Sequence, residues 1–274
     1  MSVRRTTAPA FSRKFIAVHR SWSWVRSDFA REFDRLTEAG AFQPDGPSSN
    51  MIWNTRNKYV LRASTGLGYD VAYKSFYRIR NFHQYFISPS PSAEEALNYL
   101  QLAELGFPLP DLLAAGEIRS GFLLRNSFLV TRFIEGFRDG VDFRFGSPLE
   151  HDEKNRMEFC RGHLSLLAKL HDAGILHRGF TPANLMYRMD ADGMKFCWID
   201  IASCCHAIIT TKRIADDIIN LFRFMDLSGA DRRELEEWYL NASTKRRTDA
   251  GTLSKVLEER LVRRMKRKNL TPRP

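Results

Sequence analysis

The stretch LHDAGILHRGFTPANLMY, residues 170–187, begins as the end of an apolar helix, passes through a short polar loop and enters a second apolar run. The loop contains His177, Arg178 and Asn184. Gly179 directly follows the His-Arg pair, so no carboxylate stands at that position. The segments on either side of the loop decide how this spacing is interpreted.

The segments before the loop predict an antiparallel sheet with one helix. Short runs rich in β-branched and aromatic residues are separated by turn formers, as expected of strands. These runs are residues 58–63, 70–77, 112–118 and 122–133. A helix is expected between the second and third strands, starting at a Ser92 cap and stopping at Gly106.

The chain after residue 135 is predicted to be mainly helical. Apolar side chains recur at steps of three and four residues, which predicts an amphipathic helix over residues 150–173 that ends at Gly174. These side chains are Met157, Cys160, Leu164, Leu167 and Ala168. Beyond the polar loop, 185–188 and 195–199 predict a hairpin around the turn DADG. Further helices are expected over 212–226, 231–243 and 252–267.

This order of elements resembles the two-lobed protein-kinase fold, an α+β architecture. We expect a flexible tail over residues 1–13, a sheet lobe with one helix over 14–134, and a helical lobe with a basic C-terminal helix over 135–274. In kinases a strand lysine holds the α- and β-phosphates of ATP, and a helix glutamate pairs with it.

Four residues occupy the corresponding places in this order. Lys74 in VAYKSF matches the strand lysine, and Glu95, or alternatively Glu94, matches its partner. Asn184 and Asp200 match the two magnesium ligands. Taken singly, Lys74 would be read as a solvated edge residue and Asp200 as a turn cap. Together and in this order they indicate a nucleotide site.

The chain is more specifically similar to the lipopolysaccharide kinase family, the bacterial kinase-like proteins related to Kdo and heptose kinases. The similarity runs from Lys74 through SPSAEEALNYLQLAELGFPLPDLLAAGE, and continues in LAKLHDAGILHRGFTPANLMY and FCWIDIA. This resemblance implies ATP and Mg²⁺ as ligands, and a sugar hydroxyl of the lipopolysaccharide core as acceptor. It covers about residues 55–225.

Three positions depart from the protein-kinase pattern. TGLG offers Gly66 and Gly68 as a phosphate lid without a full GxGxxG, so an ordinary hairpin turn is the alternative. Ile-Ala follows Asp200 in place of Phe-Gly. Gly179 stands where the loop would carry its catalytic carboxylate, while His177 is expected to pack the loop and Arg178 to hold the loop or a nearby carboxylate.

The loss of that carboxylate leaves three functions open. A general base contributes typically ~10²–10⁴-fold, so its loss slows phosphoryl transfer without removing nucleotide binding. The chain is then a phosphotransferase that is slow or that borrows a carboxylate from elsewhere in the cleft, or it is a pseudokinase that binds nucleotide and acts through a partner. Transfer of a nucleotide in place of a phosphate is the third possibility.

Composition bears on location and partners. The net charge of +10 favours anionic partners. The N-terminus lacks the apolar core of a signal peptide, so we expect a cytoplasmic protein, with peripheral attachment at the inner membrane as an option. The tail KVLEERLVRRMKRKNL combines an apolar face with a basic end; it packs on the helical lobe or contacts an anionic membrane. The cysteines of the chain are expected to be reduced. No nucleic-acid partner and no histidine-bound metal are expected.

Overall fold

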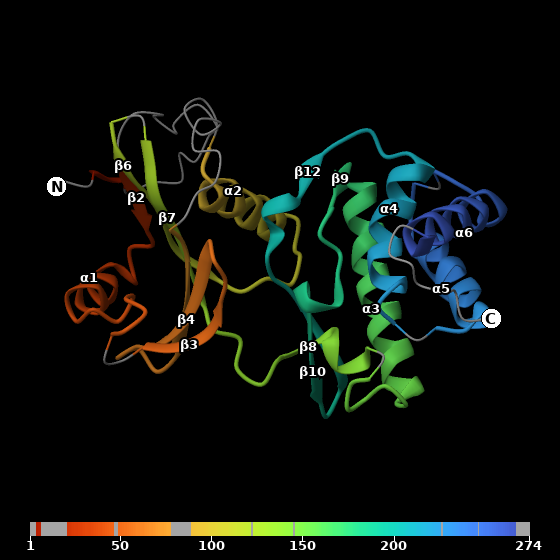
Figure 1. Cartoon of the computed structure of the whole chain (residues 1–274), viewed down its shortest axis with the longest axis horizontal. Coiled ribbons are helices and arrows are strands. Elements are labelled where there is room, and N and C mark those ends of the chain that lie inside the picture. The colour runs from red at the N-terminus through yellow and green to blue at the C-terminus, as the bar shows by residue number, and fades with distance from the viewer. Residues whose placement is uncertain are drawn as a thin grey trace. The chain divides into compact units, whose positions relative to one another are not determined.

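The chain divides into two units, Met1–Glu135 and Gly136–Pro274, in a computed structural model (Figure 1). The structure describes residues 4–6, 21–46, 49–77, 89–121, 123–144, 146–225, 227–245 and 247–266. Within the expected tail, Arg4–Thr6 form a strand, and the other tail residues lie outside the described part of the chain.

A seven-stranded sheet forms the centre of the first unit, in the order β1-β2-β6-β7-β5-β4-β3. All four strands expected from the sequence are present, and each neighbouring pair is antiparallel except β1 with β2. The strands are β1 (Arg4–Thr6), β2 (Trp22–Val25), β3 (Ser49–Asn54), β4 (Lys58–Ser64), β5 (Asp70–Phe76), β6 (Leu112–Ser120) and β7 (Leu123–Arg132).

Two helices, α1 (Ala30–Glu38) and α2 (Pro91–Glu104), cover opposite faces of this sheet. On β5, Tyr73 lies in the core that includes Leu36 of α1, whereas Lys74 reaches Glu95 of α2. Successive strand residues point to opposite faces, so the two helices must lie on different sides. The sequence analysis predicted α2 alone, although the apolar residues Ala30, Phe33 and Leu36 recur every three residues along the short helix α1.

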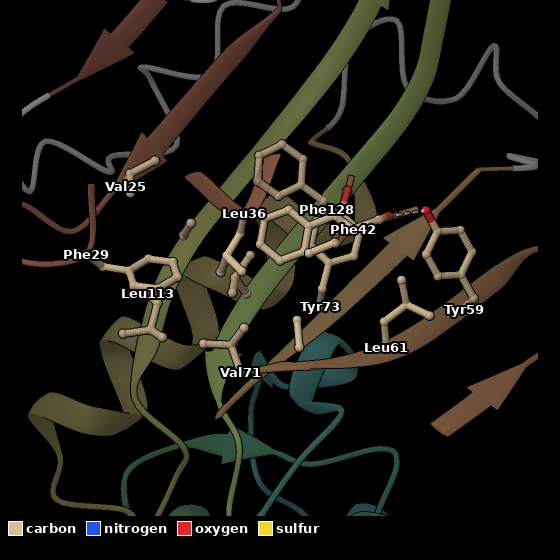
Figure 2. Close-up of a cluster of buried hydrophobic side chains, with 14 residues drawn as sticks. Val25, Phe29, Leu36, Phe42, Tyr59, Leu61, Val71, Tyr73, Leu113 and Phe128 are labelled. Atoms are coloured by element: carbon tan, nitrogen blue, oxygen red, sulfur yellow. Dashed lines mark hydrogen bonds between the residues drawn. The ribbon is translucent and has the colours of Figure 1, made fainter. Parts of the chain in front are cut away.

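Stacked aromatic rings fill the α1 face of the sheet (Figure 2). The rings of Phe42 and Tyr73 lie 4.4 Å apart at 11°, and Phe128 stacks on Tyr73 at 5.8 Å. The hydroxyl of Tyr59 donates a hydrogen bond to the carbonyl of Phe42 over 3.2 Å. Burial of a large apolar side chain contributes roughly 1.5–3 kcal/mol. This core therefore fixes the strand that carries Lys74.

The predicted start of α2 was two residues late. Ser90, not Ser92, is the cap, and its side chain accepts the N–H of Ala93 over 3.2 Å. Pro91 occupies the first helical position, where its missing N–H and fixed φ suit a helix start. The helix ends at Glu104, and Gly106 adopts a φ of +71°, as expected of a helix stop.

The second unit is mainly helical, as predicted. Helix α3 begins after the cap Asp152, and the five apolar residues of its predicted stripe are all buried. A hairpin of β10 and β11 follows, with β8 as a third strand, and β9 pairs with β12. The elements are β8 (Arg138–Asp139), α3 (Glu153–Asp172), β9 (Ile175–Leu176), β10 (Leu185–Asp190), β11 (Gly193–Trp198), β12 (Cys205–His206), α4 (Thr211–Phe222), α5 (Gly229–Ala242) and α6 (Ala250–Lys266).

The apolar face of the C-terminal helix is used inside the second unit. Leu253, Leu257 and Leu261 are buried, and α6 packs against α4 and α5. The basic residues Arg267 and Lys268 lie outside the described residues. Among the helices that the structure describes, none is long and apolar enough to cross a membrane.

Candidate active site

The first unit brings Lys74 and Glu95 together. The ammonium of Lys74 lies 2.7 and 3.0 Å from the two carboxylate oxygens of Glu95, so the contact is bidentate. The Glu95 side chain is 1% exposed and that of Lys74 is 12% exposed. Glu94, the alternative partner, is exposed on the same helix. The lysine is therefore held in one orientation with a little of its surface left accessible.

A second buried ion pair places α2, and with it Glu95. The backbone N–H of Ser90 donates to the carboxylate of Glu117 on β6 over 3.0 Å. The other oxygen of Glu117 accepts from the guanidinium of Arg119 over 2.7 Å, and both side chains are fully buried. This network joins the helix start to the sheet, which limits sliding of α2 along the strands.

The structure does not bring Gly66 and Gly68 to Lys74. Lys74 pairs with Val60 on β4, whereas the turn that contains the two glycines begins after the Ser64–Asp70 pair, at the far end of the hairpin. The N–H of Gly66 donates to Glu32 of α1 over 2.7 Å. The two glycines thus form a hairpin turn attached to α1, which was the alternative weighed from the sequence.

In the second unit, Asp217 of α4 anchors the polar loop by its backbone. One carboxylate oxygen accepts the N–H of Arg178 over 2.7 Å, and the other accepts the N–H of His177 over 2.9 Å. The same carboxylate lies 3.2 Å from Nε2 of His171, and the Asp217 side chain is 3% exposed. A buried carboxylate that accepts two N–H groups holds the loop firmly.

His177 is a packing residue of the loop. Its ring is fully buried, with edge-on contacts to Phe180 and Trp198 at centroid distances of 5.4 and 4.9 Å. Burial lowers the pKa of His177 to about 4. Its Nδ1 accepts the N–H of Gly179 over 3.3 Å. The ring is therefore enclosed by the loop and its aromatic neighbours, and it supports the loop by packing.

Arg178 has the strained backbone of the loop. Its φ is +58°, a left-handed conformation that is uncommon in non-glycine residues and is enriched at functional sites. The two N–H bonds to Asp217 stabilise this conformation. The side chain is exposed, and its guanidinium lies 3.9 Å from the sulfur of Cys205.

Gly179 and Asn184 are held together across the loop. The side-chain amide nitrogen of Asn184 donates to the carbonyl of Gly179 over 2.8 Å. A Cβ at Gly179 would meet Asn184 Nδ2, His177 Nδ1 and Ser203 Oγ at 3.5–3.8 Å, which is ordinary contact. The φ of Gly179 is not positive. A side chain at this position would therefore meet no steric obstacle at its Cβ.

Asp200 follows β11 at the point where that strand returns to the loop. The N–H of its neighbour Ile199 donates to the carbonyl of Asn184 over 3.0 Å, which extends the pairing of β10 with β11 to the loop. Asp200 itself adopts a φ of +54°. The structure thus brings the backbone of Asn184 next to the segment that carries Asp200.

The oxygens of Asn184 and Asp200 suit a hard divalent cation. Because the Asn184 amide nitrogen is used on Gly179, its Oδ1 is directed elsewhere and can act as a ligand. Mg²⁺ is typically held by one or two carboxylates, water and substrate phosphates. Within the described residues, no three His, Cys, Asp or Glu side chains gather as a metal cage. The pair therefore fits a magnesium ion whose remaining ligands come from a bound phosphate and water.

Sequence reasoning missed Asp217, the residue that fixes the loop. Its signal was present in IADDIINLF, where one of two adjacent carboxylates falls on the buried face of an apolar helix. An unpaired carboxylate is rarely buried, so a buried position implies fixed donors. Which donors it meets depends on contacts 39 and 40 residues away.

Comparisons with known proteins identify the family of this chain and solved structures that are similar to it. The family model described as "Lipopolysaccharide kinase (Kdo/WaaP) family" matches residues 70–239. A solved structure of WaaP in complex with acyl carrier protein is similar with a TM-score of 0.59 and 15% identity, covering 96% of each chain. The pseudokinase domain of BIR2, an immune regulator of the RLK/Pelle family, gives a TM-score of 0.43 and 16% identity over 83% of this chain and 86% of that one. No curated protein matches the sequence.

Proposed function

Because this chain belongs to the lipopolysaccharide kinase (Kdo/WaaP) family, we propose that it transfers the γ-phosphoryl group of ATP to a sugar hydroxyl of the lipopolysaccharide core. The observation that carries the proposal is the bidentate contact of Lys74 with Glu95. Kinases require this pairing in order to place the lysine on the nucleotide phosphates.

Lys74 is assigned to the α- and β-phosphates. A phosphate lid is needed near this lysine, and Gly66 and Gly68 lie at the wrong end of their hairpin. The turn between β3 and β4, residues 55–57, lies at the other end, because Phe76, two residues beyond Lys74, pairs with Lys58. We assign the lid to this turn.

Asn184 and Asp200 are assigned to Mg²⁺ through their side-chain oxygens. Bound there with ATP, Mg²⁺ would neutralise charge on the β- and γ-phosphates. Asp217 keeps this part of the site in place through the backbone of residues 177–178, and Asn184 fixes the carbonyl of Gly179.

Gly179 is proposed to make the transfer slow. None of the three groups nearest to its Cβ position is a carboxylate, so nothing immediately beside it replaces the usual base. Positioning and charge neutralisation supply most of the catalysis of phosphoryl transfer, and both remain. The same observation favours the alternative of a nucleotide-binding pseudokinase that acts through a partner.

A phosphate-transfer assay tests the proposal. Core oligosaccharide, labelled ATP and protein are incubated with and without Mg²⁺, and Lys74→Met serves as the inactive variant. We expect slow labelling that requires both Mg²⁺ and Lys74. Labelling that persists in Lys74→Met would contradict the assignment, and absence of any labelling despite nucleotide binding would establish the pseudokinase alternative.

An anionic membrane is the proposed place of action. Met51, Ile52 and Trp53 are 37–48% exposed on the edge strand β3, where a bulge at Ile52 breaks the alternation of side chains. The Lys58 ammonium lies 4.8 Å from the Trp53 ring centre. Apolar and aromatic side chains beside cations are typical of surfaces that contact anionic lipid.

A carrier protein is a proposed partner. One similar structure contains WaaP together with acyl carrier protein. The net charge of +10 on this chain favours an acidic partner. Size-exclusion chromatography of the chain mixed with acyl carrier protein at low and high salt tests this: we expect co-elution that salt weakens, and separate elution at both salts would reject the partner.

A further inference from the structure

A pocket of about 600 Å³ lies in the second unit, beside the polar loop. Arg178 lines one side of the pocket, and the segment that contains Cys205 and His206 lines another. Helix α4 completes the lining with Arg213, Asp217 and Asn220. The magnesium ligands Asn184 and Asp200 are not among its lining residues.

The acidic groups of this pocket are already engaged. Both oxygens of Asp217 accept loop N–H groups, and His171 contacts one of them. Asp216, the other carboxylate of the lining, forms an ion pair with Arg260 of α6. Neither carboxylate is therefore available to neutralise a further cation in the pocket.

The basic groups of the pocket keep their charge available. Arg178 and Arg213 are both exposed, and within the described residues neither guanidinium forms an ion pair. Arg178 contacts the Cys205 sulfur, and Arg213 donates one hydrogen bond to the carbonyl of Ile208 over 2.9 Å. A guanidinium has five N–H donors in a fork that matches the oxygens of phosphate. Most of these donors remain for a ligand.

We propose that this pocket binds a phosphate group through Arg178 and Arg213. If the proposed function holds, that group is a phosphate already present on the acceptor, and the pocket selects acceptors that carry one. Arg178 directly precedes Gly179, and neighbouring Cα atoms are ~3.8 Å apart. Because Arg178 lines the pocket, a phosphate held there would anchor its molecule beside the loop that contains Gly179.

Titration with inorganic phosphate tests the site without reference to catalysis. Calorimetry at constant ionic strength compares the wild-type chain with Arg213→Ala, and Lys212→Ala is the matched control because Lys212 is an exposed cation of the same helix outside the pocket. The titration is repeated with Mg²⁺ and a non-hydrolysable ATP analogue, which occupies the nucleotide site.

We expect phosphate to bind the wild type and Lys212→Ala equally, and Arg213→Ala at least ~10-fold more weakly, the effect of one lost charge-assisted hydrogen bond. Equal affinity of the wild type and Arg213→Ala, or no phosphate binding to folded wild type, overturns the proposal. Arg213→Gln checks that the loss does not arise from misfolding, since it retains hydrogen-bonding capacity on an exposed side chain.

Acceptor kinetics distinguish an acceptor phosphate from free phosphate. If the acceptor carries the anion, Arg213→Ala raises KM for phosphorylated core oligosaccharide and leaves kcat and the KM for ATP unchanged. An unchanged acceptor KM in a variant that has lost phosphate binding refutes the acceptor assignment and identifies free phosphate as the ligand. If the chain shows no kinase activity, the phosphate titration can still be interpreted, because it does not depend on phosphoryl transfer.

Discussion

The carboxylate of Asp217 accepts the backbone N–H of Arg178 over 2.7 Å, although the two residues are 39 positions apart in the sequence. This bond stabilises Arg178 at a φ of +58° and thereby sets the direction in which Gly179 and Asn184 leave the loop. The geometry of the candidate site in the second unit therefore depends on a residue of α4 that has no place in the ligand set.

Asp217→Ala should destabilise the chain and its loop together. The substitution leaves two N–H groups of the loop without their acceptor, each at a cost of ~1–3 kcal/mol, so we expect a loss of about 3 kcal/mol in the free energy of unfolding. Asp217→Asn keeps one oxygen and should lose less. Denaturant titration measures both.

The matched control is Asp216→Ala, which removes the neighbouring carboxylate and its ion pair with Arg260. Both side chains of that pair are partly exposed, so the loss should stay below about 1 kcal/mol. An equal loss in Asp216→Ala and Asp217→Ala would show that Asp217 does not have the anchoring role described here.

His177 should make stability depend on pH. Its pKa falls from an unfolded value of ~6.5 to about 4 because it is buried as a neutral ring. A depressed folded pKa gives stability that is fully present above the unfolded pKa and is lost as pH falls toward 4. By pH 4.5, protonation of this single group in the unfolded chain should lower the free energy of unfolding by about 2.5 kcal/mol.

Denaturation at pH 7.5 and pH 4.5 measures this loss. In His177→Gln the titrating ring is gone, so the decrease between the two pH values should be smaller than in the wild type by about 2.5 kcal/mol. The exposed His151→Gln is the surface control. Parallel pH profiles for the wild type and His177→Gln would contradict the prediction.

Gly179→Asp should restore activity. The structure provides room for a Cβ at this position and a backbone conformation that any residue can adopt, so the variant should fold. A carboxylate placed between His177 and Asn184 should raise phosphoryl transfer by a factor within the ~10²–10⁴ range of a positioned base. Gly179→Asn is the matched variant, because asparagine has the shape of aspartate without its charge. Its phosphoryl transfer should remain slow.

Initial rates of transfer to core oligosaccharide decide the matter, once circular dichroism and nucleotide binding show that both variants are intact. Robust wild-type transfer that Gly179→Asp leaves unchanged would mean that another residue supplies the base. In that case Gly179 would not be the cause of slow chemistry.

The β3 edge should contribute to binding of anionic lipid. Replacing Met51, Ile52 and Trp53 by Ser removes the exposed apolar group and should lower recovery with phosphatidylglycerol vesicles in sedimentation. Leu67→Ser is the control, because Leu67 is an equally exposed apolar residue in the turn between β4 and β5 of the same sheet. This variant should sediment as the wild type does.

The basic end of the C-terminal helix is tested separately. Changing Arg263, Arg264 and Lys266 to Gln removes charge worth on the order of 1 kcal/mol each near an anionic surface. Truncation of α6 is unsuitable, because its buried leucines pack on α4 and α5. Salt-independent recovery that neither set of substitutions reduces would rule out the proposed membrane contact.

The sequence predicted well those features that depend on neighbouring residues. Asn184 and Asp200 flank one hairpin, so their proximity follows from local strand pairing, and the structure joins them through Ile199. Lys74 lies on β5 and Glu95 on the next element, α2, so the order of the two elements was enough to predict that these residues pair. The buried stripe of α3 followed from its helical period.

The sequence could not predict features set by register or by distant contacts. Gly66 and Gly68 form a turn like many others, and only the pairing of Lys74 with Val60 shows that they lie at the far end of the hairpin. Asp217 acquires its meaning from donors on a loop about forty residues away. Helix α1 is only nine residues long, and it packs on an aromatic core whose members come from several strands.

Magnesium-dependent nucleotide binding is the most direct test of the proposed site. Calorimetry with ATP should give binding to the wild type in Mg²⁺ that is abolished by EDTA. It should also be lost in Asp200→Ala, while Asp192→Ala, an exposed carboxylate in the turn of the same hairpin, binds as the wild type does. Absence of magnesium-dependent binding to folded wild-type protein, or equal binding by Asp200→Ala, would contradict the assignment of Lys74, Asn184 and Asp200 to an ATP site.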